Sequence, residues 1–283
     1  MFDRIQKHAL ISTVLLAFSF GVVAEEIVMV PVSLDGETVQ LEMLIYKPDA
    51  IEKPRPTLVL NHGSTGYGND PSLFTAKVDY FHPIIDHFIA RDWVVIAPMR
   101  RGRGGSEGLY DEGFDEARTS YTCETDLSLK GAYRGLDDIH ASVEAISTMP
   151  FVDKDRLVIS GVSRGGILST AYAGIYPDDV KGVINFVGGW ISDWCSTADD
   201  INGALFRDGG KAKVSSIWLY GENDSFYSMA HSRNNFDTYV SAGGDGEFHT
   251  IELDDEINGH FVNMYSNTWT KLVDEYLKQI DVE

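Results

Sequence analysis

The sequence predicts a three-layer α/β fold, with helices on both faces of a mostly parallel sheet and an antiparallel hairpin at its N-terminal end. After residue 57, short apolar runs alternate with longer helical stretches, which is typical of buried parallel strands joined by crossover helices. Residues 27–32 and 39–46 flank a turn at Asp35-Gly36 and predict the hairpin. A serine between two glycines directly follows one apolar run and predicts a sharp strand-to-helix turn.

The elements follow one another in a regular order after the hairpin. The expected strands are 57–60, 93–97, 157–160, 183–187, 217–220 and 248–253. The expected helices are 81–91, 127–148, 165–175, 228–241 and 266–280. Residues 109–126 are polar and irregular. In such folds functional groups collect in the loops at the carboxyl ends of the strands.

The chain is long enough for one large domain with a proper core. It has 283 residues, of which 43% are hydrophobic. We therefore expect residues 25–283 to form a single domain. The segment at 188–215 has room for at most a small cap, because the stretch of chain between the strands at 183–187 and 217–220 is too short for an independent lid.

The first 24 residues have the layout of a secretory signal peptide. Arg4 and Lys7 precede an apolar run from Ala9 to Val23, and Val22-Val23-Ala24 supplies small residues for cleavage. A retained membrane anchor is the alternative, although the run is short of the about 20 residues that a span needs. No later stretch is long enough to span a bilayer. The sequence thus predicts a periplasmic or secreted protein.

The chain is strongly acidic, with a formal charge of −20. Residues 1–24 carry Asp3, Arg4 and Lys7, so their removal would change the charge to −21. Such a field repels phosphate backbones and argues against a nucleic-acid partner. The oligomeric state is left open.

Two cysteines, Cys123 and Cys195, lie 72 positions apart. This spacing excludes a Cys-x-x-Cys metal or redox motif. In an oxidising compartment two cysteines are more often bonded than free, so we expect a Cys123–Cys195 disulfide, with two free thiols as the alternative. The bond would tie the loop at 109–126 to the segment at 188–210.

The most specific motif lies in residues 156–166, which read R-L-V-I-S-G-V-S-R-G-G. Gly161-Val162-Ser163-Arg164-Gly165 matches the Gly-x-Ser-x-Gly nucleophile elbow. Glycines flank the serine because a side chain there would clash with neighbouring backbone. Unpaired N–H groups at the start of the next helix can stabilise a developing negative charge. Taken alone, the motif is equally compatible with an ordinary turn, so the rest of the chain has to decide.

A serine hydroxyl is a poor nucleophile until a base, usually an oriented histidine, takes its proton. In elbow-type sites the chain order is Ser, then Asp or Glu, then His. Three histidines follow Ser163. His260 lies in the loop between the last strand and the last helix, whereas His249 falls in an expected strand and His231 in an expected helix. We therefore predict His260 as the base.

The acid is expected on the loop after the penultimate strand, in Gly221-Glu222-Asn223-Asp224. Asp224 is the predicted residue, and Glu222 is its competitor. Asp254 and Asp255 lie nearer His260 in the sequence but follow the final strand, where they are less well placed to support the far side of the imidazole.

An oxyanion needs two backbone donors. One is expected to be the N–H of Arg164, directly after the nucleophile. The other is expected in the loop His62-Gly63-Ser64-Thr65-Gly66, where Gly63 frees the backbone and Ser64 supplies the N–H. A plain turn is the alternative for this loop.

These motifs together resemble those of the α/β-hydrolase superfamily, and the resemblance covers almost the whole mature chain. L-V-L-N-H-G-S-T-G at 58–66, G-V-S-R-G-G at 161–166, G-E-N-D at 221–224 and N-G-H at 258–260 occur in the family's order. The chain looks most similar to the dienelactone hydrolase and prolyl-oligopeptidase-like branch, where Asp-x-x-Arg, here at 153–156, commonly leads into the elbow. Dienelactone hydrolases use cysteine, whereas this chain has Ser163. The resemblance implies an α/β-hydrolase fold and a serine hydrolase without a metal or organic cofactor.

Two further groups of side chains lie near the expected site. Arg100, Arg101 and Arg103 follow an expected strand and either bind a substrate carboxylate or form structural ion pairs, which we favour in so acidic a chain. Four aromatic residues follow strand ends and either line an acyl or aromatic pocket or pack in the core: Trp190, Trp194, Phe226 and Tyr227.

The sequence as a whole predicts an exported serine hydrolase that acts on small-molecule carboxylic esters through Ser163, His260 and Asp224. A peptidase of the prolyl-oligopeptidase type is the first alternative, although such enzymes usually carry an accessory domain for which this chain has no room. A non-catalytic binding protein on a hydrolase scaffold is the second alternative. The presence of all three triad residue types and of both oxyanion loops argues against it.

Overall fold

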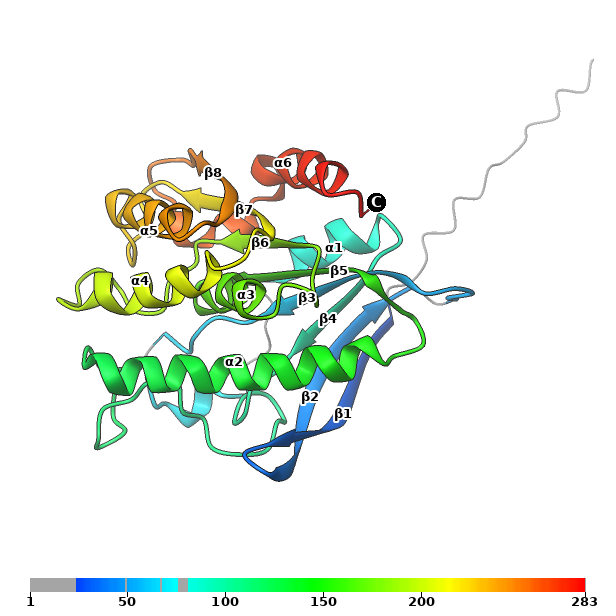
Figure 1. The fold of residues 1–283 in the computed structure, drawn as a ribbon, viewed down its shortest axis with the longest axis horizontal. Coiled ribbons are helices and arrows are strands. Elements are labelled where there is room, and N and C mark those ends of the chain that lie inside the picture. The colour runs from blue at the N-terminus through cyan, green and yellow to red at the C-terminus, as the bar shows by residue number, and fades with distance from the viewer. Residues whose placement is uncertain (1–23, 49, 67, 76–80, 283) are drawn as a thin grey trace, which may run out of the picture.

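The computed structural model describes residues 24–48, 50–66, 68–75 and 81–282. An eight-stranded sheet runs through the molecule in the order β1-β2-β4-β3-β5-β6-β7-β8 (Figure 1). Of the predicted signal peptide, residues 1–23 lie outside the described residues, and Ala24 begins β1. Within the described ranges, no helix combines the length and the apolarity needed to cross a bilayer.

The sheet is mostly parallel, as the sequence predicts. Its strands are β1 (Ala24–Leu34), β2 (Glu37–Lys47), β3 (Arg55–Asn61), β4 (Val94–Pro98), β5 (Val152–Val162), β6 (Gly182–Phe186), β7 (Ser215–Gly221) and β8 (Asp245–Ile251). The β1–β2 hairpin is antiparallel, and β2 also pairs antiparallel with β4. All pairs from β4 to β8 are parallel.

Helices cover both faces of this sheet (Figure 1). They are α1 (His82–Ile89), α2 (Thr125–Ser147), α3 (Arg164–Ile175), α4 (Ala198–Gly209), α5 (Met229–Ser241) and α6 (Ser266–Gln279), with short 3₁₀ helices η1 (Pro71–Leu73) and η3 (Gly259–Met264). Helices α1 and α6 pack together on one face. On the other face α3 lies between α2 and α4, and α4 also contacts α5. The segment proposed as a small cap thus contains α4, which packs beside α3.

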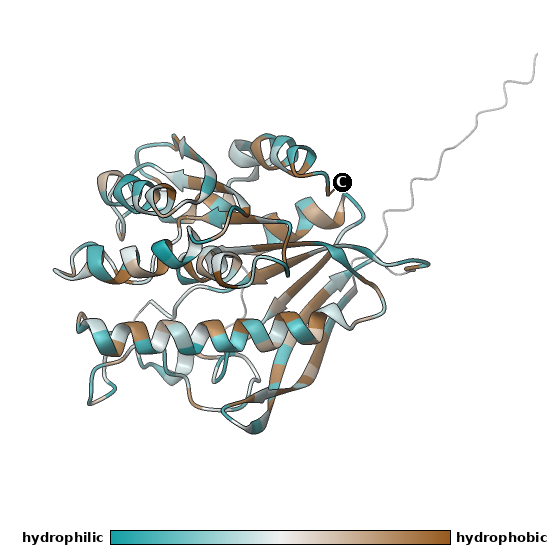
Figure 2. Cartoon of the chain, in the orientation of Figure 1, coloured by the Kyte–Doolittle hydropathy of each residue, from teal (hydrophilic) through white to brown (hydrophobic). Residues whose placement is uncertain are grey.

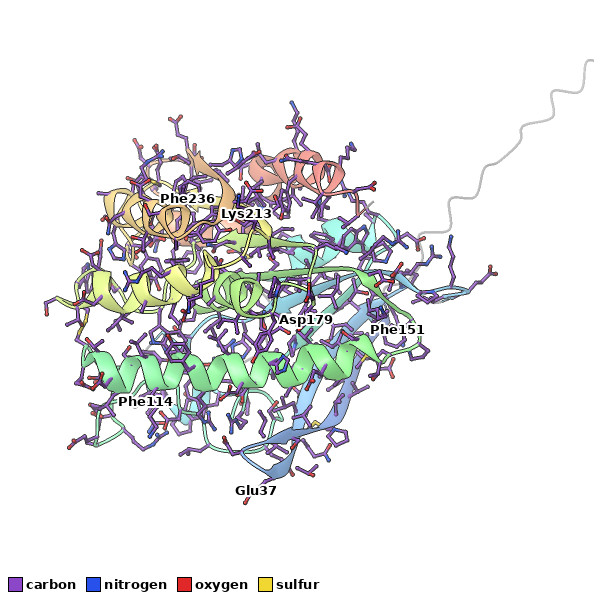
Figure 3. The ribbon with its side chains drawn as sticks, viewed as in Figure 1. Glu37, Phe114, Phe151, Asp179, Lys213 and Phe236 are labelled. Atoms are coloured by element: carbon purple, nitrogen blue, oxygen red, sulfur yellow. A yellow bond between two sulfur atoms is a disulfide. The ribbon has the colours of Figure 1, made fainter. Side chains whose placement is uncertain are left out.

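The core forms because apolar side chains repeat with the period of each element. In α2, Leu136, Ile139, Val143 and Ile146 lie on one face and are buried, while all five residues of β6 are buried on both faces. Hydrophobic residues accordingly concentrate in the strands (Figure 2). Side chains fill the space between helices and sheet (Figure 3), as where Phe236 of α5 meets Trp218 of β7 edge-on with ring centroids 5.1 Å apart.

Most expected elements are found with ends shifted by a few residues, and helix α4 was not among the expected helices. Two further differences concern the elements that carry Ser163 and His260. Strand β5 begins at Val152 rather than at 157, because the polar residues 153–155 form an exposed extension in which Val152 pairs with Arg55. The segment around His260, expected as a loop, is the 3₁₀ helix η3, which Asn258 caps by accepting a hydrogen bond from the His260 N–H. Neither difference moves a predicted site residue away from the carboxyl edge of the sheet.

Candidate active site

Ser163 lies at the turn between β5 and α3. Its backbone has φ 56° and ψ −121°, in a region that residues other than glycine rarely adopt. The N–H groups of Gly166, Ile167 and Gly189 donate to its carbonyl oxygen at 2.9 to 3.2 Å, and its own N–H donates to Phe186 at 3.0 Å. The surrounding structure therefore holds a strained conformation at this serine.

The two motif glycines are required by close backbone contacts. A Cβ atom on Gly161 would lie 2.2 Å from the carbonyl carbon of Gly165, and a Cβ on Gly165 would lie 2.0 Å from the carbonyl oxygen of Asn61. The start of α3 can therefore sit directly against the ends of β5 and β3. This contact places the α3 N-terminus beside the loop that follows β3.

One cavity of about 700 Å³ brings four of the predicted residues together. Ser163 and His260 both line it, as do Ser64 and Arg164. Neither the Ser64 N–H nor the Arg164 N–H has a hydrogen-bond partner among the residues that the structure describes. Two free backbone donors thus lie in the same cavity as the serine and the histidine.

His260 is paired with a buried carboxylate. Its Nδ1 lies 2.9 Å from Oδ2 of Asp224, whose side chain is only 3% exposed. The other oxygen of Asp224 accepts hydrogen bonds from the N–H groups of Phe226 at 2.7 Å and Tyr227 at 3.1 Å. Because the carboxylate only accepts, this geometry assigns the ring hydrogen to Nδ1 and leaves Nε2 as the acceptor.

The competing acids lie elsewhere. Glu222, Asp254 and Asp255 are exposed to solvent. None of them lines the cavity, and the described hydrogen bonds join none of them to His260.

The two other histidines have separate partners. His231 of α5 places Nδ1 2.9 Å from Asp199 and Nε2 2.9 Å from the amide nitrogen of Asn202. His249 of β8 lies 3.4 Å from Glu247. Neither lines the cavity that contains Ser163.

The loop after β3 is held by a neutral histidine. Burial lowers the pKa of His62 well below its ordinary value, and the nearby charges of Arg100 and Arg103 lower it further. The neutral ring can therefore donate from Nδ1 to the carbonyl oxygen of Gly63 at 2.8 Å and accept the Arg100 N–H at Nε2 at 3.2 Å. These bonds fix the backbone immediately before Ser64.

Sequence profiles place the chain in a known family. The profile described as the alpha/beta hydrolase fold matches residues 56–208, just over half of the 283 residues. The chain belongs to the α/β-hydrolase fold family. None of the curated proteins searched matches this hydrolase-fold chain.

Solved structures share the α/β-hydrolase fold at low sequence identity. The esterase Pf2001 of Pyrococcus furiosus has a TM-score of 0.62 at 13% identity, with 90% of each chain covered. Est1E of Butyrivibrio proteoclasticus, solved with ferulic acid, has a TM-score of 0.64 at 14% identity, with 90% of this chain and 100% of that chain covered. The acylaminoacyl peptidase of Pyrococcus horikoshii has a TM-score of 0.59 at 16% identity, but only 41% of that chain is covered against 90% of this one.

All four aromatic residues singled out in the sequence line the cavity of this hydrolase-fold protein. Trp190 is buried and donates from Nε1 to Ser128 at 3.1 Å, whereas Trp194 is 85% exposed at the rim. Phe226 packs against the His260 ring with centroids 4.6 Å apart. Burial raises the pKa of Tyr227, and the Tyr227 hydroxyl donates to the carbonyl oxygen of Gly189 at 2.8 Å.

Several lining residues were not singled out in the sequence, among them Tyr121, Phe261 and Asn263. Tyr121 comes from the irregular loop before α2, and Phe261 and Asn263 come from η3. Arg164 places its guanidinium between the rings of Tyr121 and Trp190, 3.7 and 4.1 Å from their centroids. Phe261 could have been found from its position next to His260, but no local pattern marks Tyr121.

The structure also contains the Cys123–Cys195 disulfide, with the two Cα atoms 5.7 Å apart. It joins the segment before α2 to the loop before α4. No group of three or more His, Cys, Asp or Glu side chains within the described ranges could hold a metal ion.

Proposed function

We propose that this protein is a serine hydrolase that cleaves carboxylic esters through Ser163, His260 and Asp224. One observation carries the proposal: a single cavity holds a serine on a strained elbow, a histidine oriented by a buried carboxylate, and two backbone N–H groups that have no partner among the described residues. These are the nucleophile, base, orienting acid and oxyanion donors that acyl transfer requires.

In the proposed reaction, His260 Nε2 takes the Ser163 proton as the hydroxyl oxygen attacks the ester carbonyl carbon. The Ser64 and Arg164 N–H groups hold the resulting oxyanion, and Asp224 stabilises the imidazolium from the Nδ1 side. His260 then gives the proton to the leaving alcohol, which produces an acyl-enzyme. Water activated by the same histidine releases the acid and restores Ser163. No step needs a metal or an organic cofactor.

The lining of the cavity favours esters with a bulky apolar or aromatic group. Its walls carry six aromatic side chains: Tyr121, Trp190, Trp194, Phe226, Tyr227 and Phe261. Such walls bind planar apolar groups well. Est1E, a similar fold, was solved with the aromatic acid ferulic acid, which agrees with this proposal.

A peptidase of the prolyl-oligopeptidase type remains the second candidate, because an acylaminoacyl peptidase shares the fold. This chain covers only 41% of that protein, so the likeness to the peptidase is limited to the hydrolase fold. A panel of acyl p-nitrophenyl esters and aminoacyl nitroanilides separates the two activities. We expect the esters with aromatic or medium-length apolar acyl groups to be cleaved and the anilides to be resistant.

The Ser163→Ala variant completes this experiment. It should fold normally and lose ester hydrolysis, because no other hydroxyl lies on the elbow. Retained hydrolysis would remove Ser163 from its role. A wild-type protein that binds the esters without cleaving them would favour the non-catalytic alternative.

We further propose that residues 1–24 are removed during export and that the mature chain, residues 25–283, acts as a single domain in the periplasm or outside the cell. The disulfide supports this location. N-terminal sequencing of protein recovered from the periplasm or medium tests it. A first residue near Glu25 is expected, and an intact N-terminus in the membrane fraction would instead identify an anchor.

The disulfide is proposed to fix the rim of the cavity. Tyr121 and Trp194, which line the cavity, lie two residues and one residue from the bonded cysteines, and the Thr197 hydroxyl donates to the Cys123 carbonyl. Replacing both cysteines by serine should raise KM more than it lowers kcat. Two reactive thiols in denatured, unreduced protein would contradict the bond itself.

A further inference from the structure

Arg103 is a buried cation with no ion-pair partner in the part of the chain that the structure describes. It lies in the loop that follows β4 and is 4% exposed. Its neighbours in this loop are paired: Arg100 contacts Glu112 at 2.6 Å, and Arg101 contacts Asp138 at 2.5 Å. Arg103 has no carboxylate within 4 Å among the described residues, and its Nε has no hydrogen-bond partner there. The ion pairing expected for this loop therefore holds for two arginines and fails for the third.

The guanidinium of Arg103 points at one carbonyl group. Its Nη1 lies 3.3 Å from the carbonyl oxygen of Gly63. The same oxygen receives the Nδ1–H of His62 at 2.8 Å and Nη2 of Arg100 at 3.4 Å. Two cations and one neutral donor thus converge on a single peptide oxygen, in a region shielded from water.

That carbonyl belongs to the peptide unit whose N–H is the proposed oxyanion donor, since Gly63 C=O and Ser64 N–H share one peptide bond. Hydrogen-bond donors at the carbonyl oxygen of a peptide group draw electron density toward that oxygen, which makes the N–H of the same peptide group a stronger donor. Hydrogen bonds in a chain polarise one another by the same effect. The two arginine contacts are long for hydrogen bonds, so their charge matters more than their bond geometry. The effect is a more positive N–H at Ser64.

The charges around this peptide do not balance in the free protein. Arg164 lies 3.6 Å from Glu112, which Arg100 also contacts. Arg100 and Arg164 therefore share the carboxylate of Glu112, and the charge of Arg103 also acts on Glu112 from beyond ion-pair distance. Among these four side chains a formal excess of two positive charges remains. Neither Arg100 nor Arg103 lines the cavity. They therefore do not bind a substrate carboxylate directly, which was the alternative role considered for the arginines of this loop.

We propose that Arg103, together with Arg100, is a positioning residue of the oxyanion hole and acts through the Gly63–Ser64 peptide. The excess positive charge of Arg100, Arg103, Arg164 and Glu112 is compensated when negative charge develops on the substrate oxygen in the transition state. This inference rests on the proposed function. Preorganised positive charge of this kind stabilises the transition state more than the ground state, so it raises kcat more than it changes KM.

The test compares three substitutions with one control. Arg103→Met and Arg103→Gln remove the charge, Arg103→Lys keeps it, and Arg91→Met removes an arginine that pairs with Asp274 on a distant face. We expect the two neutral variants to lose about 10- to 100-fold in kcat, below the full loss of one oxyanion donor, with KM within about threefold. A boronic acid, whose adduct with the serine carries the negative charge, should bind more weakly by a similar factor.

Arg103→Lys should keep most of the activity, and Arg91→Met should keep all of it. Melting temperatures supply a second readout. Since Arg103 is an unpaired buried charge, the neutral variants should melt at or above the wild-type temperature. A residue that only holds the loop would instead lower the melting temperature, and it would weaken substrate and boronate binding equally.

Unchanged kcat and boronate affinity in a folded neutral variant would overturn the inference. A fall in kcat in Arg103→Lys equal to that in Arg103→Met would overturn it too. Because two neutral variants are included, the comparison can still be made if one of them does not fold. Ser163→Ala distinguishes a failure of the Arg103 proposal from a failure of the proposed function. If it is inactive while Arg103→Met is fully active, only this inference fails. If it remains active, the proposed function fails as well.

Discussion

Two histidine–aspartate pairs in this molecule have the same bond length and different surroundings. Nδ1 of His260 lies 2.9 Å from Asp224, and Nδ1 of His231 lies 2.9 Å from Asp199. The side chain of Asp224 is 3% exposed and that of Asp199 is 73% exposed. The pair distance alone therefore cannot distinguish a general base from a structural histidine.

The second ring nitrogen makes the difference. Nε2 of His231 accepts the Asn202 amide at 2.9 Å, whereas Nε2 of His260 has no hydrogen-bond partner in the described parts of the chain and its ring lines the cavity with Ser163. A base needs a free nitrogen that faces the proton it will take. His260 meets this condition and His231 does not.

His231 instead supports the cavity wall through Asn202. The Asn202 amide oxygen accepts the N–H groups of Trp190 at 2.9 Å and Ile191 at 3.2 Å, and its nitrogen donates to the Ile191 carbonyl at 2.9 Å. Trp190 and Ile191 both line the cavity. The second pair therefore shapes the pocket without taking part in proton transfer.

The largest contrast is expected from the histidines themselves. His260→Ala should lower kcat by about 10⁴-fold or more while the protein stays folded, because triad members act as a unit. His231→Ala should keep kcat within about tenfold, because its ring holds only the wall. Steady-state hydrolysis of a p-nitrophenyl ester, with circular dichroism as the folding control, measures both. An equal fall in kcat in the two variants would contradict the assignment of His260 as the general base and of His231 as a structural residue.

The two aspartates paired with these histidines should differ in the same direction, with a smaller difference in kcat. Asp224→Asn should cost about 10²- to 10⁴-fold in kcat, because the neutral amide no longer enforces the ring tautomer or stabilises the imidazolium. Asp199→Asn should change kcat by less than about twofold, since its carboxylate is largely solvated. If Asp224→Asn proved harmless, Glu222 or Asp254 would become the candidate acid.

The smallest effect on kcat is expected at Asn202. Asn202→Ala leaves buried backbone groups of the cavity wall without partners, so it should lower the free energy of unfolding by about 2–4 kcal/mol and raise KM, with kcat little changed. Asn234→Ala, an exposed site on α5, is the control and should stay within about 0.5 kcal/mol. Urea unfolding of both variants gives the comparison. A fall in kcat without a change in stability would contradict a supporting role.

The sequence predicts the sheet well because fully buried parallel strands leave near-continuous apolar runs. Val183 to Val187 is such a run and corresponds to β6. The start of β5 was missed because its exposed extension carries the charged residues 153–155 and no apolar period. Local pattern thus locates the buried parts of strands and not their solvated ends.

The site is predictable to the extent that it depends on local geometry. The elbow at Ser163 and the loop before Ser64 follow from glycines with a local steric role, and Asp224 and His260 follow from chain order. The convergence of Arg103 and Arg100 on the Gly63 carbonyl leaves no such trace. Neither does the pairing of Glu112 with Arg100, or the placement of Tyr121 over Arg164, because these contacts join loops whose conformations depend on tertiary packing.

The most direct test of the central claim is covalent labelling with an alkyl fluorophosphonate, followed by peptide mass spectrometry. We expect one adduct, on Ser163, whose formation is slowed by orders of magnitude in His260→Ala and little changed in His231→Ala. An adduct on a different serine, or undiminished labelling of Ser163 in His260→Ala, would contradict it.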